Sequence, residues 1–240
     1  MAYSQINPVP GQVQQGYFYQ LDNIQREILG TVIAGVDNYY GYAEFMYVQF
    51  PASTPITQGQ VLVVSGFGGT NGMVASIAPV TANTGRGIAV CFNAVPNVAS
   101  IQYGWVMISG AAVIKAVASV AAGVTFGIDV TTAGSVNAAS AGRQVLNAVS
   151  LQPSTFTVVK TATLTNGTNK IVVANIDGIV PGLAVSGTGV SGVVSSVDPD
   201  NRTVLLSVNN TTGGNSTVTF TYTGFIVGQI NRSFLQGQIT

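Results

Sequence analysis

The spacing of the apolar residues is the feature that most constrains the fold of this 240-residue chain. Apolar residues alternate with polar ones in short runs, which is typical of β-strands because successive side chains point to opposite faces. The runs end at Gly, Asn, Ser, Thr or Pro and recur every ~8–12 residues, which favours a barrel or a sandwich. The clearest expected strands cover residues 60–64, 104–109, 113–117, 155–160, 170–174, 193–197, 203–208, 216–223 and 225–230. We therefore expect an all-β fold.

Two segments are possible exceptions to this pattern. Residues 23–29 are compatible with a helix, but a helix of that length is unstable on its own in water. Residues 105–128 are apolar enough to suggest a membrane span, yet Lys115 lies near the centre of the stretch. A central lysine costs about 2.5–3.5 kcal/mol on insertion scales. We therefore expect no stable helix and no membrane contact.

Composition and turn residues divide the chain into three expected parts. Residues 1–30 contain Gln and Pro and are expected to form an extended N-terminal arm. Residues 31–160 together with 225–240 are expected to form one small β-barrel or sandwich, the base domain. Residues 161–224 are rich in Thr, Asn, Gly and Val and have their own turn residues. We expect them to form a second β domain inserted into the first.

The chain lacks most of the side chains that carry chemistry. It has no histidine, one cysteine and only 7% charged residues, against about 25% in an average globular domain. Histidine is the commonest general acid or base and a frequent metal ligand. A single cysteine forms neither an internal disulfide nor a zinc cluster, and the apolar neighbours of Cys91 favour a buried thiol. We expect no enzyme, no metal site and no cofactor.

The few charges also limit the partners. Eight basic and eight acidic residues give a net charge of zero. Binding to nucleic acid normally needs clustered Lys and Arg, and here these residues are scattered singly. A net charge near zero does little to oppose self-association. We expect no direct contact with nucleic acid, and a chain that works packed against copies of itself or another protein.

Two short motifs are better explained as turns than as binding sites. Residues 187–192 read G-x-G-x-x-G, but a dinucleotide site needs this motif between a strand and a helix. Here a strand and then a second turn follow, so we expect a glycine-rich β-turn. Residues 198–201 (Asp-Pro-Asp-Asn) offer carboxylates for calcium, yet they lack the other acidic ligands of a calcium loop. We expect a tight turn there as well.

Paired carboxylates, which hydrolyse glycosides in many enzymes, are a further possibility. The acidic residues close enough in sequence to form such a pair are Asp22, Glu27, Asp37 and Glu44. Glu27 follows Arg26 directly, and Trp105 is the single tryptophan available as a platform beside a sugar. A polysaccharide-degrading enzyme is therefore the least supported function.

Aromatic residues are the most informative cluster. Six of them lie between Tyr39 and Phe50. On a strand that starts at Tyr42, odd-numbered and even-numbered residues face opposite sides, and both faces are apolar. Such a strand is either central in a core or covered by another subunit, and tyrosine is a frequent interface anchor. The candidate residues for an interface with another subunit or a partner protein are Tyr3, Tyr17, Phe18, Tyr19, Tyr40, Tyr42, Phe45 and Tyr47.

An ordered series of sequence blocks between residues 25 and 150 carries a resemblance to a known family. The blocks are residues 29–37, 40–48, 52–54, 59–61, 87–90, 103–105, 108–112 and 133–136. Their order and spacing resemble capsid-decorating (cement-type) virion proteins of tailed bacteriophages. The resemblance implies a small β-barrel on the outer face of a capsid, often a trimer, that bridges subunits of the major capsid protein.

The expected insert has a resemblance of its own. Residues 163–167 and 182–190 are similar to β-rich modules of phage fibres and bacterial surface proteins. The functional hypothesis is therefore a capsid-stabilising decoration protein, with the N-terminal arm (3–19) reaching a neighbouring subunit. The alternative is a fibre or tail adhesin that binds a glycan or protein of the host surface through the inserted domain.

Overall fold

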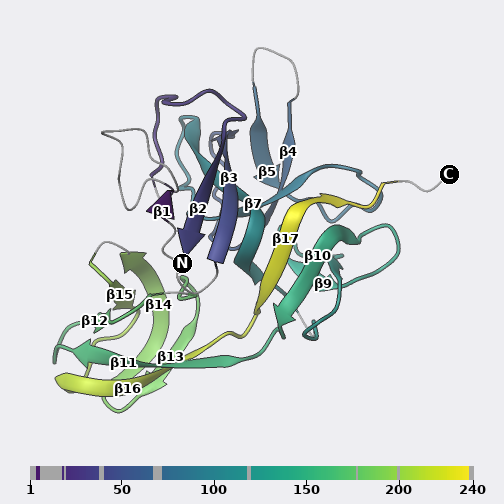
Figure 1. Ribbon diagram of the computed structural model, residues 1–240. Helices are drawn as coiled ribbons and strands as arrows, with labels where there is room; N and C mark the ends of the chain where they lie inside the picture. The colour runs from purple at the N-terminus through teal and green to yellow at the C-terminus, as the bar shows by residue number, and fades with distance from the viewer. Residues whose placement is uncertain are drawn as a thin grey trace. The chain divides into compact units, whose positions relative to one another are not determined.

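The computed structural model describes residues 4–5, 18, 20–37, 41–66, 72–117, 120–176, 178–198 and 201–237 (Figure 1). The named elements in this part of the chain are all β-strands, which confirms the all-β prediction. Residues 23–29 form bends and turns instead of a helix. No helix among the described residues is long and apolar enough to cross a membrane.

The chain divides into two compact units. One contains residues Thr155–Thr223, and the other contains Tyr3–Ser154 and Gly224–Thr240. We call them the inserted unit and the base unit. The sequence placed the first boundary after residue 160, whereas the inserted unit begins at Thr155. The reason is strand pairing, because Thr157–Leu164 pairs along its length with strands of the inserted unit.

The base unit is built around one large sheet. Its strands are β1 (Ser4–Gln5), β2 (Val32–Asp37), β3 (Gly41–Phe50), β4 (Val61–Ser65), β5 (Val74–Ile77), β6 (Ile88–Cys91), β7 (Gln102–Lys115), β8 (Phe126–Ile128), β9 (Val136–Ala138), β10 (Val145–Gln152) and β17 (Phe225–Leu235). The sheet order is β1-β2-β3-β5-β4-β6-β7-β17-β10, and β8 and β9 form a separate hairpin. Because β3 also pairs with β7, the strands from β3 to β7 close into a small barrel.

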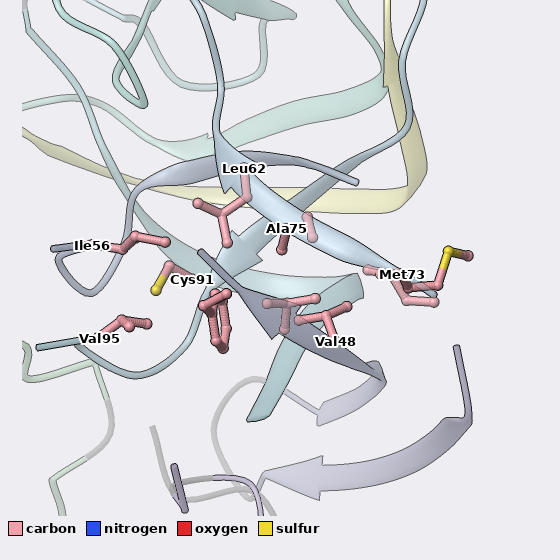
Figure 2. Packing of buried hydrophobic residues seen from close by; sticks show 11 residues of the cluster. Val48, Ile56, Leu62, Met73, Ala75, Cys91 and Val95 are labelled. Carbon is pink, nitrogen blue, oxygen red and sulfur yellow. The ribbon is translucent and has the colours of Figure 1, made fainter. Parts of the chain in front are cut away.

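The interior of this small barrel is mainly aliphatic, with Phe50 as its aromatic residue (Figure 2). Val48 and Phe50 of β3 face it, and Leu62, Ala75 and Cys91 come from the strands opposite. Cys91 is fully enclosed, and burial raises the pKa of its thiol to about 12. The prediction that this cysteine is a buried apolar residue is therefore confirmed.

Strand β7 corrects one boundary drawn from the sequence. Two strands separated at Gly110 were expected, and the structure has one strand of 14 residues. Gly110 has a φ of 123°, a backbone conformation that glycine adopts without strain. A Cβ atom built there would lie 2.6 Å from the Cβ of Ala43. A glycine inside a strand here marks a close approach to β3, not the end of the strand.

The inserted unit is a second, closed barrel. Its strands are β11 (Thr157–Leu164), β12 (Lys170–Val173), β13 (Ala184–Gly187), β14 (Val190–Asp198), β15 (Thr203–Leu206) and β16 (Gly214–Thr221). They close in the order β11-β12-β15-β14-β13-β16. The side chains that fill it are mainly aliphatic, with Phe220 as the large exception.

Both expected turns lie in the inserted unit. Within residues 187–192, Thr188 and Gly189 form the tight turn between β13 and β14, and Gly187 pairs with Val190 across it. The predicted glycine-rich turn is confirmed, and no helix follows it. At the other end of β14, the Asn201 side-chain amide donates to the Asp198 carboxylate at 2.8 Å. Asp198 pairs with Thr203, so the chain reverses direction between β14 and β15; Pro199 and Asp200 of the expected turn lie outside the described residues.

The inserted unit occupies a single strand connection of the base unit. Strands β10 and β17 are antiparallel neighbours, with Ser150 opposite Gly228. The inserted unit is the chain between them. Its own ends also meet, because the Tyr222 N–H donates to the Phe156 carbonyl at 2.8 Å and their rings stack at 4.0 Å. The second barrel is thus a closed module placed in a hairpin connection.

Candidate interaction surface

Three of the proposed interface aromatics lie in the interior of the base unit. Phe18 stacks on Phe45 with ring centroids 4.1 Å apart. Trp105 lies beside Phe18 and meets Tyr47 at 5.1 Å in an edge-to-face arrangement. Phe18, Phe45 and Tyr47 are all buried within this chain. The odd-numbered face of β3 is therefore a core face, covered by a residue of the N-terminal arm.

The other proposed interface residues have different positions. Tyr42 is 55% exposed and remains available for contact with a partner. Tyr3, Tyr17, Tyr19 and Tyr40 lie outside the described residues. Within the arm, Ser4–Gln5 pairs with β2 of the same chain. The described parts of the arm therefore pack against the subunit's own sheet.

The even-numbered face of β3 leads from the barrel interior to solvent. Val48 lies in the core cluster, and Met46 packs against that cluster. Further along the same face, Tyr42 is exposed. On the neighbouring strand β2, Val32 and Val36 are also exposed, opposite Met46 and Tyr42 respectively. These apolar side chains share the face with the Glu44 carboxylate, which lies between Met46 and Tyr42.

A cavity of about 210 Å³ opens in this surface. Its lining residues are Val32, Met46, Val64, Met73, Gly87, Ile88, Ile108, Arg232 and Ser233. Met73 and Ile108 also belong to the barrel core, so the cavity lies at the margin of that core. The mouths of small barrels are a common place for ligand sites. We call this cavity, together with exposed Val36 and Tyr42, the barrel-mouth surface.

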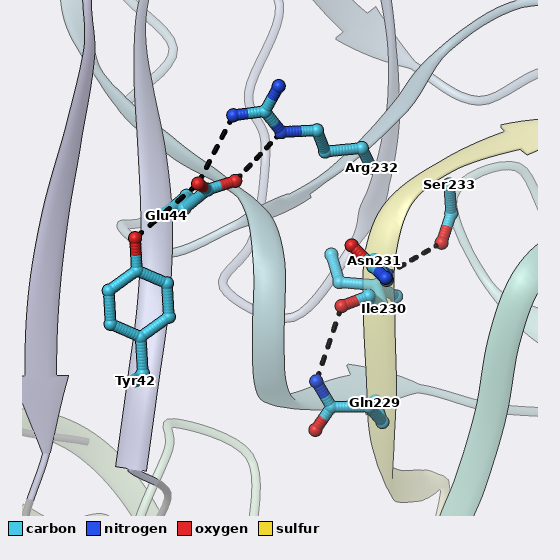
Figure 3. A network of polar contacts seen from close by, with 7 residues as sticks. All are labelled: Tyr42, Glu44, Gln229, Ile230, Asn231, Arg232 and Ser233. Atoms are coloured by element: carbon cyan, nitrogen blue, oxygen red, sulfur yellow. Dashed lines mark hydrogen bonds and ion pairs between the residues drawn. The ribbon is translucent and has the colours of Figure 1, made fainter.

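An ion pair joins β3 to β17 at the rim of the cavity (Figure 3). The Arg232 Nε donates to Glu44 Oε2 at 2.8 Å, and Nη2 donates to Oε1 at 3.1 Å. The hydrogen bonds from this guanidinium lower the pKa of Glu44. The Tyr42 hydroxyl donates to the same carboxylate at 3.4 Å. Two-point contact holds the guanidinium in one orientation at the cavity.

The backbone at Arg232 is in an unusual conformation. Its φ is 44°, and that of Asn147 on the paired strand β10 is 59°. The β10–β17 register shifts at this point, and the Ser233 hydroxyl donates to the Asn147 carbonyl at 2.7 Å. Irregular pairing of this kind re-aims side chains. Positive φ at a non-glycine residue costs about 1–3 kcal/mol and is concentrated at functional sites.

The acidic residues considered for glycoside hydrolysis have other partners. Glu44 binds Arg232, and the Asp22 carboxylate lies 2.7 Å from the Arg26 guanidinium. The side chain of Asp37 lies outside the described residues. Among described residues, no three His, Cys, Asp or Glu side chains are grouped closely enough to hold a metal ion.

One buried carboxylate has a structural role. Asp129 is 3% exposed. Its Oδ2 accepts hydrogen bonds from the Thr131 and Thr132 N–H groups at 2.9 and 2.7 Å. Its Oδ1 accepts one from the Asn137 amide at 3.0 Å. These donors lower the pKa of Asp129, and the contacts hold the turn between β8 and β9.

Sequence reasoning missed most of the barrel-mouth surface. Val32, Met73 and Arg232 were not singled out, because they come from three segments far apart in the chain. Glu44 was considered only as a catalytic acid. The polar run at residues 231–233 inside an otherwise apolar strand was the one local signal of the irregular backbone.

Comparison of the chain with protein-family models, with curated proteins and with solved structures finds no match. The functional argument therefore rests on the geometry of the barrel-mouth surface and on the sequence features described above.

Proposed function

We propose that this chain is a structural protein of a tailed-phage particle, which decorates the capsid and stabilises it without catalysing a reaction. The observation that carries the proposal is the barrel-mouth surface, where exposed Val32, Val36 and Tyr42 adjoin an apolar cavity. A cavity at the mouth of a small barrel with exposed apolar side chains beside it is typical of a binding site. The resemblance of residues 25–150 to cement-type proteins supplies the partner class, the major capsid protein.

The proposed mechanism is mechanical. Each copy, as part of a homotrimer on the outer face of the capsid, buries apolar surface against neighbouring capsid subunits. A standard interface buries about 1,600 Å², and apolar area removed from water contributes about 25 cal/mol per Å² before the costs of association. Repeated over a shell, a modest gain per copy opposes the outward pressure of packaged DNA.

The composition supports a protein that functions in an assembly. With 7% charged residues and no net charge, electrostatic repulsion between copies is weak. The described residues of the N-terminal arm pair with β2 and pack on β3 of the same chain. The arm therefore extends the sheet at its β2 end. We propose no contact with nucleic acid and none with a membrane.

A cryo-EM map of the intact particle tests this proposal. We expect density for the chain at regular positions over the outer face of the shell. We also expect particles without the chain to release DNA at a lower temperature than complete particles. Density confined to the tail would contradict decoration.

One observation favours the alternative, an adhesin that acts through the inserted unit. The outer face of that barrel carries exposed Val172, Val193 and Leu205 on the adjacent strands β12, β14 and β15. An adhesin predicts a few copies per particle and a shell of unchanged stability. The same cryo-EM map and heating experiment therefore distinguish the two functions.

A further inference from the structure

The cavity at the barrel mouth is larger than the packing of the base unit requires. Protein cores are close-packed and contain few voids larger than a water molecule. This cavity measures about 210 Å³ and adjoins Met73 and Ile108 of the barrel core. An apolar cavity of about 150 Å³ stays dry and binds benzene. The space at the barrel mouth therefore accommodates a molecule the size of a substituted benzene.

The walls of the cavity are apolar and adaptable. Apart from Arg232 and Ser233, the lining consists of aliphatic residues, two methionines and one glycine. Met46 and Met73 are the methionines, and their unbranched thioether side chains fill irregular space and contact aromatic rings favourably. Small-molecule sites typically combine such walls with a few polar groups that fix the orientation of the ligand. The walls favour an apolar ligand, aromatic or branched.

One guanidinium supplies the polar group at the rim (Figure 3). Arg232 Nε and Nη2 donate to the Glu44 carboxylate at 2.8 and 3.1 Å. This two-point contact fixes the orientation of the guanidinium. Its Nη1 has no partner among the described residues and can donate to an oxygen atom of a ligand. The Ser233 hydroxyl, the other polar side-chain group of the lining, already donates to the Asn147 carbonyl at 2.7 Å.

The charges at the rim favour an uncharged ligand. The Glu44 carboxylate compensates the charge of Arg232, and the other lining residues are uncharged. An anionic group placed at Nη1 would lie close to the carboxylate of Glu44 and would lose its own hydration, and both effects are unfavourable. A neutral carbonyl or ether oxygen accepts the same hydrogen bond without these costs.

The backbone conformation gives independent support for a site at Arg232. The φ angles of Arg232 and Asn147 are 44° and 59°. Conformations of this kind persist only where the surrounding structure holds them, and they cluster at active sites and ligand clamps. Here the hydrogen bond from Ser233 to Asn147 and the two from Arg232 to Glu44 hold the segment in place.

From these observations we infer that the barrel mouth contains a binding site for a small molecule. Its ligand is an uncharged, apolar compound with one acceptor oxygen, such as an aromatic ketone or a short branched ester. The apolar part occupies the cavity in contact with Met46 and Met73, and the oxygen accepts a hydrogen bond from Arg232 Nη1. The inference concerns the free chain and does not depend on the proposed role on the capsid.

A titration of the full-length chain with acetophenone, followed by NMR of ¹³C-methyl-labelled methionine, tests the inference. Met46 and Met73 line the cavity. Met107 is buried on the face of β7 opposite to Ile108 and serves as the internal control. We expect the methyl signals of Met46 and Met73 to shift and to saturate, and that of Met107 to stay in place. No saturable shift up to about 10 mM acetophenone, or equal shifts of all three signals, would overturn the inference.

Two further probes define the chemical class of the ligand. Toluene lacks the acceptor oxygen, and benzoate carries a negative charge. We expect benzoate to bind at least about tenfold more weakly than acetophenone. In Arg232→Asn, where asparagine tolerates the positive φ, the ratio of acetophenone affinity to toluene affinity should fall about three- to tenfold. Tighter binding of benzoate than of acetophenone, or an unchanged ratio in Arg232→Asn, overturns the assignment of an uncharged ligand held by Nη1.

A variant that fills the cavity locates the site. Gly87 lines the cavity, and a Cβ atom built on it meets nothing within 4 Å, so Gly87→Leu should occupy the space without disrupting the fold. The matched control is Gly213→Leu in the inserted unit, where the nearest atom to a built Cβ lies at 3.6 Å. We expect Gly87→Leu to abolish the methyl shifts and Gly213→Leu to leave them unchanged.

The fluorescence of Trp105 in the base unit checks that Gly87→Leu is folded. Native ligand binding by the folded variant overturns the inference. All these readouts use the free chain. Loss of ligand binding is therefore distinguished from loss of capsid coating, which is measured on the particle.

Discussion

The two units of this chain differ in whether their sheets close completely. The inserted unit closes its six strands into one barrel, in which each strand has two neighbours. The base unit closes only the strands from β3 to β7 and continues on both sides, through β2 and β1 and through β17 and β10. A closed barrel removes edges on which other strands can add. Among the described residues, the large sheet of the base unit therefore has end strands, β1 and β10, whereas the barrel of the inserted unit has none.

The cores of the two units also differ. The base unit has a mainly aliphatic barrel interior on one face of β3 and an aromatic cluster on the other. The inserted unit has one aliphatic interior, with Phe220 inside it and a stacked Phe156–Tyr222 pair where the chain enters and leaves. Each unit has its own core, so we expect the two to unfold separately.

The largest expected effect comes from removing one large core side chain in each unit. Phe45→Ala deletes a ring that packs on Phe18 and Phe92 and should lower the stability of the base unit by about 3–5 kcal/mol. Phe220→Ala should cost the inserted unit a similar amount. Trp105, the single tryptophan, lies beside Tyr47 in the base unit, so its fluorescence follows that unit. The midpoint of the tryptophan transition should fall in Phe45→Ala and stay constant in Phe220→Ala. Equal shifts in both variants would show one cooperative unit.

A smaller effect is expected where β7 passes β3 closely. Gly110→Ala forces alanine to a φ of 123°, which costs about 1–3 kcal/mol, and its Cβ meets that of Ala43. Gly87→Ala in the same unit, where the space is open, is the matched control and should change stability by less than about 0.5 kcal/mol. Urea denaturation followed by tryptophan fluorescence measures both. Similar values for the two variants would contradict the assignment of Gly110 to a close approach.

Asp129 gives the base unit a pH dependence. Asp129→Asn removes a buried carboxylate that accepts several hydrogen bonds and should cost about 1–3 kcal/mol at pH 7. The folded state lowers the pKa of Asp129, so its contribution is complete above the unfolded value of about 3.9 and is lost as the pH falls below it. The difference between native chain and variant in urea denaturation should therefore shrink below about pH 4. A difference that is constant from pH 7 to pH 2 would refute this role.

The smallest effect is expected at the buried hydroxyl of the inserted unit. The Tyr222 hydroxyl donates to the Gly178 carbonyl at 2.7 Å, and Tyr222→Phe leaves that carbonyl without its donor. The cost should be about 0.5–1.5 kcal/mol, visible in calorimetry as a lower transition for the inserted unit. Tyr42→Phe removes an exposed hydroxyl and is the control. A loss of stability in Tyr42→Phe but not in Tyr222→Phe would contradict the role given to the Tyr222 hydroxyl.

Local alternation predicted an all-β chain and located several of its strands, but it missed others, among them β5 and β10, and did not show how the strands come together. It located the edges of β4, β12 and β15 to within one or two residues, because each runs between strong turn residues. It failed at Gly110, since a glycine that ends a strand and one that lets a strand pass another have the same local sequence. It also placed residues 155–160 with the wrong unit, because the pattern of β11 does not reveal its partners.

The interaction surface was harder to predict for the same reason. The alternation around Phe45 left a core and a subunit contact equally open, and the choice depended on Phe18, which lies far away in the sequence. The pair of Glu44 and Arg232 spans 188 positions, beyond the reach of any local pattern. The place of β2 in the sheet could not be predicted, because the partners of a strand depend on the whole sheet.

Hydrogen exchange measured by mass spectrometry, on the free chain and on the chain bound to its phage particle, tests the central claim most directly. The account predicts slower exchange on the particle at β2 and β3, over residues 32–46, and at the β17 segment that contains Arg232. Exchange in the inserted unit should stay the same. Protection confined to the inserted unit, with β2 and β3 exchanging as in the free chain, would contradict the account.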